Sequence, residues 1–230
     1  QAAAALRAEI PVGPDVTSIV DTNATRWIYS RREAVADSAA VDADSGPIVI
    51  DVLANDTDAD IGDTRMVVSV SGGTAVTQLM RGTASVAADG QSVVYSSNGA
   101  FDYLGAGQTA IETLTYTMAD GAGAETTAVV EVTVNGVNDG PTAVADNATA
   151  AEDGAAVTID VLANDIDPDI GDTRTVIAVA AAGLQGAVSI AADGGSVVYD
   201  VGTAFQGLGA WATATETFSY TIADAAGAQS

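Results

Sequence analysis

The chain has 230 residues, with 31 acidic residues against 7 basic ones, a net charge of −24, and neither cysteine nor histidine. This charge excludes binding to nucleic acid through its phosphates, and the lack of cysteine excludes a disulfide framework or a thiolate zinc site. No apolar run is long enough to span a membrane, and residues 1–7 lack the charged and apolar regions of an intact signal peptide. The expected partners are therefore cations or a basic surface.

Residues 1–32 form a segment that matches no later part of the chain. They hold four of the seven arginines against three acidic residues, a net charge of +1, so the basic residues gather at one end. We interpret this stretch as an extended N-terminal segment that precedes the first domain.

The remaining chain reads as two repeats, 33–140 and 141–230. The clearest evidence is residues 51–65, which return almost unchanged as 160–174. Each copy begins as an apolar strand and ends as a loop crowded with aspartates. Hydrophobic residues make up 48% of the chain, so each repeat can bury a core of its own.

Strand patterns recur through both repeats. Apolar residues alternate with polar ones in the first repeat, and the same pattern returns in the second. The expected strands are 47–53, 66–70, 84–87, 92–95, 112–120 and 128–134 in the first repeat, and 157–162, 175–179, 187–190, 196–199 and 216–224 in the second. With no helical periodicity, they predict an all-β chain of two tandem β-sandwich domains, about seven strands each.

The acidic loops are the best candidates for a binding site. Closely spaced carboxylates repel one another unless a cation lies among them, and calcium prefers oxygen ligands. The spacing is not that of an EF-hand, because Gly62 falls one place late and Val67 stands where a closing glutamate is required. The alternative is that these aspartates only form turns and lie in solvent.

Three motifs together resemble a known family. Residues 137–141 between the repeats read Val-Asn-Asp-Gly-Pro, each acidic loop follows Asp-Val-Leu-Ala-Asn-Asp, and residues 112–117 read Glu-Thr-Leu-Thr-Tyr-Thr. Residues 33–230 thereby resemble the VCBS and bacterial cadherin-like repeats of large secreted adhesins. The resemblance implies tandem Ig- or cadherin-like sandwiches at a bacterial cell surface, often with calcium between neighbouring domains. It implies a structural or adhesive role, with a cell-surface or matrix ligand as partner.

The resemblance also implies a set of calcium ligands. They fall in the linker, in the acidic loops and near the last strands of the repeats. The predicted metal-binding residues are Asn138, Asp139, Asp167, Asp169, Asp224, Glu112, Asp58 and Asp60.

One repeat boundary departs from this pattern. The alignment that places 51–65 on 160–174 also places the linker residues 138–141 opposite 29–32, which read Tyr-Ser-Arg-Arg. A guanidinium group can neutralise carboxylates directly. We therefore predict that Arg31 or Arg32 pairs with Asp58 or Asp60, in place of a linker-bound calcium.

The second repeat suggests a mode of assembly. It reaches Ser230 before any counterpart of strand 128–134, and a sandwich without its last strand exposes an edge that can accept another chain. By the same alignment, residues 17–21 fall opposite 126–130. Residues 1–32 of one molecule are thus expected to complete the second repeat of its neighbour, which would build a head-to-tail filament. The alternative is that the sequence is a fragment of a larger repeat protein.

Other function classes have less support. Without histidine, cysteine or lysine, most catalytic nucleophiles and bases are missing, so we expect no enzyme. The competing function is a carbohydrate-binding module of a secreted protein, with Trp211 and Tyr103 as a stacking platform. Both aromatic residues are equally compatible with ordinary packing.

Overall fold

The computed structural model describes residues 17–19, 28–30, 32–58, 63–72 and 80–230. Every regular element in these ranges is a strand. The described residues therefore include no helix that could span a membrane. Contacts divide the chain into two units. The first combines Gln1–Phe101 with Thr109–Asn135, and the second combines Asp102–Gln108 with Gly136–Ser230. At the start of the first unit, β1 (Thr17–Ile19) pairs antiparallel with β2 (Ile28–Ser30).

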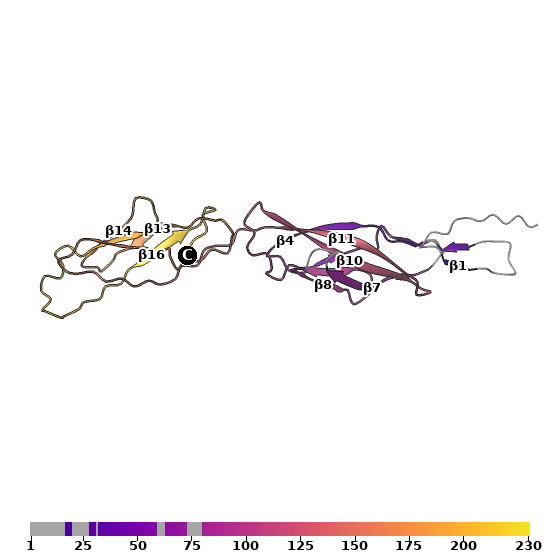
Figure 1. Ribbon diagram of the computed structural model, residues 1–230, viewed down its shortest axis with the longest axis horizontal. Coiled ribbons are helices and arrows are strands. Elements are labelled where there is room, and N and C mark those ends of the chain that lie inside the picture. The colour runs from indigo at the N-terminus through magenta and orange to yellow at the C-terminus, as the bar shows by residue number, and fades with distance from the viewer. Residues whose placement is uncertain (1–16, 20–27, 31, 59–62, 73–79) are drawn as a thin grey trace, which may run out of the picture. The chain divides into compact units, whose positions relative to one another are not determined.

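A four-stranded sheet forms one layer of the first unit (Figure 1). Its order is β4–β11–β10–β7, with β4 at Asp37–Asp42, β7 at Arg65–Gly72, β10 at Thr109–Asp120 and β11 at Glu125–Asn135. The long strands β10 and β11 form an antiparallel hairpin, while β4 runs parallel to β11. Strand β11 therefore lies between two partners and joins β4 to the rest of the sheet.

A three-stranded sheet forms the other layer. Its order is β5–β9–β8, with β5 at Ile48–Ile50, β8 at Thr83–Val86 and β9 at Val93–Ser96. The turn between β8 and β9 contains Gly90, whose φ of +68° favours glycine, as the Asp-Gly sequence predicts. The predicted seven-stranded sandwich is thereby confirmed for the first unit. Two further short strands, β3 (Arg32–Glu33) and β6 (Thr57–Asp58), pair antiparallel.

The core of the first unit comes from alternate residues of these strands. The side chains of Leu114, Tyr116 and Met118 on β10 are fully buried. Val130, Val132 and Val134 on β11 are fully buried as well, as the alternation predicts. Burying one such side chain contributes about 1.5–3 kcal/mol, so β11 is a major part of this core.

The second unit has the same plan with fewer strands. One sheet has the order β12–β15–β14, with β12 at Val157–Ile159, β14 at Ala187–Ile190 and β15 at Val197–Asp200. The other sheet pairs β13 (Thr175–Ala180) with β16 (Ser219–Ala223). The core contains Val161, Val176, Val197 and Ile222. The second unit thus has five strands, one in each of the five stretches that the sequence predicts for it, against seven in the two sheets of the first unit.

The strands that the two sheets of the second unit lack, compared with those of the first, all lie at or beside the place that β11 takes in the first unit. Strand β16 begins only at Ser219, although the sequence predicts a strand from Glu216, and residues 146–151, the counterpart of β4, form no strand. Both segments flank the place that β11 takes in the first unit. Within residues 136–230, no strand fills that place. A strand is stabilised by its ladder of hydrogen bonds, so the two flanking segments lose their regular structure without a partner.

Candidate metal centres

Among the residues that the structure describes, each unit holds one group of three carboxylates close enough together to share a metal ion. Asp58, Asp63 and Asp120 form the first cluster, and Asp167, Asp172 and Asp224 form the second. Within each cluster, one oxygen from each residue lies within 4.8 Å of the others. The two clusters occupy matching places, because each combines the acidic loop with an aspartate at the end of a matching strand: Asp120 is the last residue of β10, and Asp224 directly follows β16. Carboxylates at this separation repel one another unless positive charge or hydrogen-bond donors compensate them.

Backbone amides position the second cluster. Asp224 Oδ1 accepts a hydrogen bond of 2.8 Å from Ala228 N, across the turn that follows β16. Asp172 Oδ1 accepts bonds from Thr173 N (2.6 Å) and Ala225 N (3.2 Å). The acidic loop is therefore tied to the turn after β16 by the same side chains that make up the cluster.

The first cluster is positioned by the equivalent bonds. Asp120 Oδ1 accepts from Ala124 N at 2.8 Å. Asp63 Oδ1 accepts from Thr64 N at 2.7 Å and from Gly121 N at 3.1 Å. The two units thus build their clusters in the same way, which allows what surrounds each cluster to be compared directly.

The linker completes the second cluster. Asn138 Nδ2 donates a hydrogen bond of 2.8 Å to Asp224 Oδ2, and Asp139 N donates one of 3.0 Å to Asp169 Oδ2. The structure therefore brings together the predicted residues Asn138, Asp139, Asp167, Asp169 and Asp224. Because the Asn138 amide nitrogen makes this bond, the side-chain oxygen of Asn138 is the atom suited to a cation.

Two buried oxygens in this region lack a hydrogen-bond donor among the described residues. They are Asp167 Oδ2 and Asp169 Oδ1. A buried carboxylate oxygen without a donor is costly, and a bound cation removes that cost. The surrounding side-chain ligands are all oxygens of aspartate and asparagine, which calcium prefers. The second cluster therefore fits a calcium ion.

The titration of the cluster residues reflects these surroundings. Burial raises the pKa of Asp167, and the neighbouring charges of Asp172, Asp169 and Asp224 raise it further, although the Asp169 amide opposes them. The hydrogen bond from Asn138 holds the pKa of Asp224 below its usual value. The surroundings of Asp167 thus oppose its charge, whereas those of Asp224 favour the charged form.

An arginine lies in the first cluster. Arg32 Nε donates a hydrogen bond to Asp120 Oδ2 and lies 3.9 Å from Asp58 Oδ2. The predicted pairing of an arginine with Asp58 is thereby confirmed for Arg32. Arg31 and Asp60 lie outside the residues that the structure describes.

Sequence reasoning missed three members of the clusters. They are Asp63, Asp172 and Asp120. The first two belong to the Gly-Asp-Thr-Arg sequence that ends both acidic loops, and this shared ending was the available signal. In a loop with so many aspartates, the sequence does not indicate which side chains turn toward one another.

The predicted ligand Glu112 belongs to another contact. Its Oε2 accepts hydrogen bonds from Tyr95 OH at 2.7 Å and from Gly82 N at 3.2 Å, and its Oε1 accepts one from Arg81 N at 2.5 Å. Glu216 makes the matching bonds in the second unit, including one of 2.5 Å from Tyr199 OH. These bonds use both carboxylate oxygens of Glu112 inside the first unit, and they do not test its predicted role as a calcium ligand.

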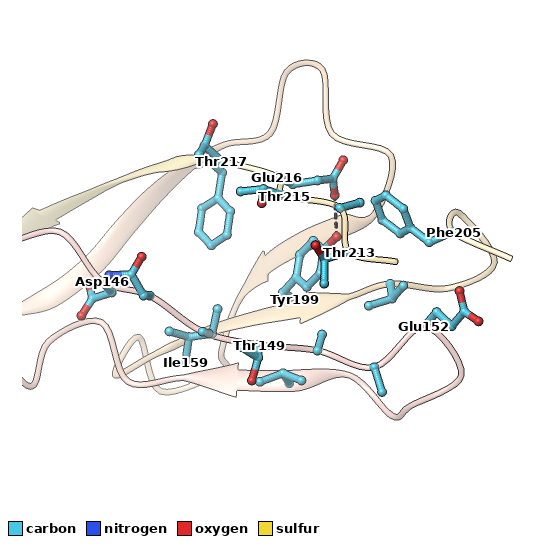
Figure 2. A pocket seen from close by; sticks show the side chains of 18 of the residues that line it. Asp146, Thr149, Glu152, Ile159, Tyr199, Phe205, Thr213, Thr215, Glu216 and Thr217 are labelled. Carbon is cyan, nitrogen blue, oxygen red and sulfur yellow. Dashed lines mark hydrogen bonds between the residues drawn. The ribbon is translucent and has the colours of Figure 1, made fainter. Parts of the chain in front are cut away.

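The second unit also contains a groove of about 1000 Å³. Figure 2 shows it between the segment that holds Asp146 and Thr149 and the segment that holds Thr213 and Thr217. Trp211 lines it with a fully exposed side chain and a φ of +71°. The other predicted sugar-stacking residue, Tyr103, is half-buried. The groove occupies the place that β11 fills in the first unit.

The comparison with known protein families agrees with this architecture. The family model for the bacterial cadherin-like domain matches residues 32–136 and again residues 138–230. Among solved structures, protocadherin gamma B2 extracellular cadherin domains 1–5 match at 14% identity and a TM-score of 0.47, over 87% of this chain and 37% of that one. Human CDH23 EC21–23 matches at 16% identity and a TM-score of 0.38, over 85% of this chain and 64% of that one. The chain therefore spans less than two thirds of either structure.

A search of curated proteins finds no match. The two matches to the family model nevertheless cover most of the chain. The chain belongs to the bacterial cadherin-like domain family, of which it holds two tandem copies.

Proposed function

We propose that this chain is a structural and adhesive part of a bacterial extracellular protein, and that calcium bound at the second cluster fixes its linker. Domains of this family are usually non-catalytic and are typical of extracellular proteins. The observation that carries the proposal is the convergence of the linker residues Asn138 and Asp139 on the acidic loop and on Asp224. The adhesive target would be a cell-surface or matrix ligand.

The proposed calcium ligands come from three parts of the second unit. They are Asn138 and Asp139 from the linker, Asp167, Asp169 and Asp172 from the acidic loop, and Asp224 from the turn after β16. Calcium takes six to eight oxygens, so an ion among them joins segments that are far apart in sequence. Such an ion holds residues 136–140 against the unit and stabilises it by linkage, by about 2.7 kcal/mol at a calcium concentration of 100 times Kd.

Thermal unfolding with calcium and with a chelator tests this proposal. We expect calcium to raise the Tm of the wild-type chain and to have little effect on an Asp224→Asn variant. The matched control is Asp120→Asn, which makes the same change in the first cluster and is expected to keep the calcium effect. Equal Tm values for the wild-type chain in both conditions would contradict the proposal.

A second candidate function is head-to-tail assembly, and the groove of the second unit favours it. In the first unit, β11 pairs with β10 on one side and with β4 on the other. The matching segments 213–218 and 146–151 line the groove and lack strand structure (Figure 2). A strand added there would pair with both and would bury the apolar floor of the groove.

The proposed occupant is the N-terminal segment of a second copy. The alignment of the two repeats places 17–21 opposite 126–130 of β11, and residues 17–19 form strand β1. Residues 1–32 carry a net charge of +1, and the carboxylates of Asp146, Glu152 and Glu216 line the groove. Because the donor and the acceptor are different parts of the molecule, the contact does not close on itself and builds a filament.

Deletion of residues 1–28 tests the assembly. We expect the wild-type chain to form filaments in electron micrographs and to sediment as a polymer, and the deleted chain to remain monomeric. A synthetic peptide with the sequence of residues 125–135 should enter the groove and block assembly of the wild-type chain. A wild-type chain that stays monomeric at high concentration, or unchanged filaments after the deletion, would contradict the proposal.

A further inference from the structure

We infer that Arg32 is the resident cation of the first cluster, so that this cluster excludes calcium while the second one requires it. The inference goes beyond the proposed function, because it concerns the first unit, where a side chain takes the place that we propose for calcium in the second. It rests on a comparison of the two clusters, which the same backbone bonds build in the same way.

The same carboxylate oxygen has a different partner in each unit. In the second unit, Asp224 Oδ2 accepts a bond from the neutral side-chain amide of Asn138. In the first unit, Asp120 Oδ2 accepts a bond from the positively charged guanidinium of Arg32. A calcium ion beside this oxygen would be attracted in the second unit and repelled by the arginine in the first.

Burial strengthens the effect of the arginine. The side chain of Arg32 is 10% exposed, and those of Asp58 and Asp120 are 4% and 1% exposed. Charges so far removed from water are weakly screened, and a buried arginine between two carboxylates is costly to displace. The guanidinium also occupies part of the space between these carboxylates that a metal ion would need.

The backbone pairing shows which residue takes the place of Arg32 in the second unit. Strand β3 pairs with β6 so that Arg32 lies opposite Asp58 and Glu33 lies opposite Thr57. The second unit has the matching bridge between Thr142 and Ile166, which align with Glu33 and Thr57. The counterpart of Arg32 is therefore Pro141, a short uncharged residue that brings no positive charge to the second cluster.

The consequence is a division of roles between the repeats. The first unit carries its own counter-charge at the acidic loop, so its stability does not depend on the calcium concentration. The second unit depends on calcium for the same purpose.

Calorimetric calcium titration of the full chain tests this inference. All variants carry Asp224→Asn, so that the second cluster does not contribute and a failure of the proposed function does not affect the result. We expect no binding with Arg32 present, and one ion bound per chain at millimolar calcium after Arg32→Gln. The matched control is Arg81→Gln, which removes the same charge from an exposed residue of the first unit and should create no site.

Two results would overturn the inference. One is calcium binding by the Asp224→Asn chain that disappears on further substitution of Asp63→Asn, since the first cluster would then bind calcium beside Arg32. The other is a folded Arg32→Gln chain that binds no calcium. Circular dichroism shows whether that variant folds, and refolding on addition of calcium would support the inference. If the variant does not fold in either condition, the Asp63→Asn comparison decides.

Discussion

The side-chain amide of Asn138 donates a hydrogen bond of 2.8 Å to Asp224 Oδ2, although the two residues are 86 positions apart in the sequence. This bond connects the linker to the turn that follows the last strand of the second unit. It lowers the pKa of Asp224 and therefore keeps that carboxylate ionised. The bond also orients the Asn138 side chain, so it prepares one side of the proposed calcium site.

Removing this bond should weaken calcium binding. We expect Asn138→Ala to lower the calcium affinity of the chain by about 10- to 100-fold, as is typical when a group that orients metal ligands is lost. Calorimetric titration measures the change. Asn135→Ala is the matched control, because the side chain of Asn135 donates an exposed bond of 3.3 Å to Asp42 in the first unit. An unchanged affinity in Asn138→Ala would exclude a role of the linker amide.

The raised pKa of Asp167 predicts that the effect of Asp167→Asn on the Tm changes sign when calcium is added. At neutral pH in a chelator, Asp167→Asn should raise the Tm by roughly a few degrees, because it removes a buried charge that its neighbours repel. With calcium, the same variant should be less stable than the wild-type chain, because it has lost a ligand.

The pH dependence of the calcium-free chain follows from the same shift. The folded state binds a proton at Asp167 more readily than the unfolded state does, so this residue adds stability at low pH and loses that contribution as pH rises through its folded pKa. The advantage of Asp167→Asn in chelator should therefore shrink as the pH falls. Melting curves between neutral and acidic pH measure it, and a wild-type chain that is the more stable one at neutral pH without calcium would contradict the prediction.

Glu112 is expected to support the fold rather than the metal. Its carboxylate accepts bonds from Tyr95 and from the backbone of residues 81–82. Glu112→Ala should leave these donors unsatisfied and destabilise the first unit by about 1–3 kcal/mol, with calcium affinity unchanged. Glu131→Ala, on the exposed side of the adjacent strand, is the control. Loss of calcium binding in Glu112→Ala would instead identify it as a ligand.

Whether the groove accepts a strand can be tested without the N-terminal segment of a second copy. We expect a chain extended after Ser230 by the sequence of residues 127–135 to fill its own groove with a strand like β11. The extension should raise the Tm of the second unit by several degrees and prevent assembly. An extension of the same length with proline at alternate positions should do neither, because it cannot form the ladder. An unchanged Tm with the strand-forming extension would show that the groove does not accept a strand.

The sequence predicts the strands better than the sites. Alternating valines predict the buried face of β11 because burial depends on a local period, and Val130, Val132 and Val134 are all buried. The strand expected at 216–224 is shorter, since its length depends on a neighbour that local pattern does not reveal. The acidic loops indicate a metal site, but they do not show that Asp63 and Asp172 join the clusters. That choice depends on backbone amides that are distant in the sequence, at Gly121 and Ala225.

A crystal structure of the full chain, from crystals grown in calcium, tests most directly whether calcium binds among Asp167, Asp172 and Asp224. We predict one ion with oxygens of these residues at about 2.3–2.6 Å, identified by its anomalous scattering, and none between Arg32 and Asp120. No ion at the second cluster at millimolar calcium, or an ion at the first cluster with Arg32 turned away into solvent, would contradict the account.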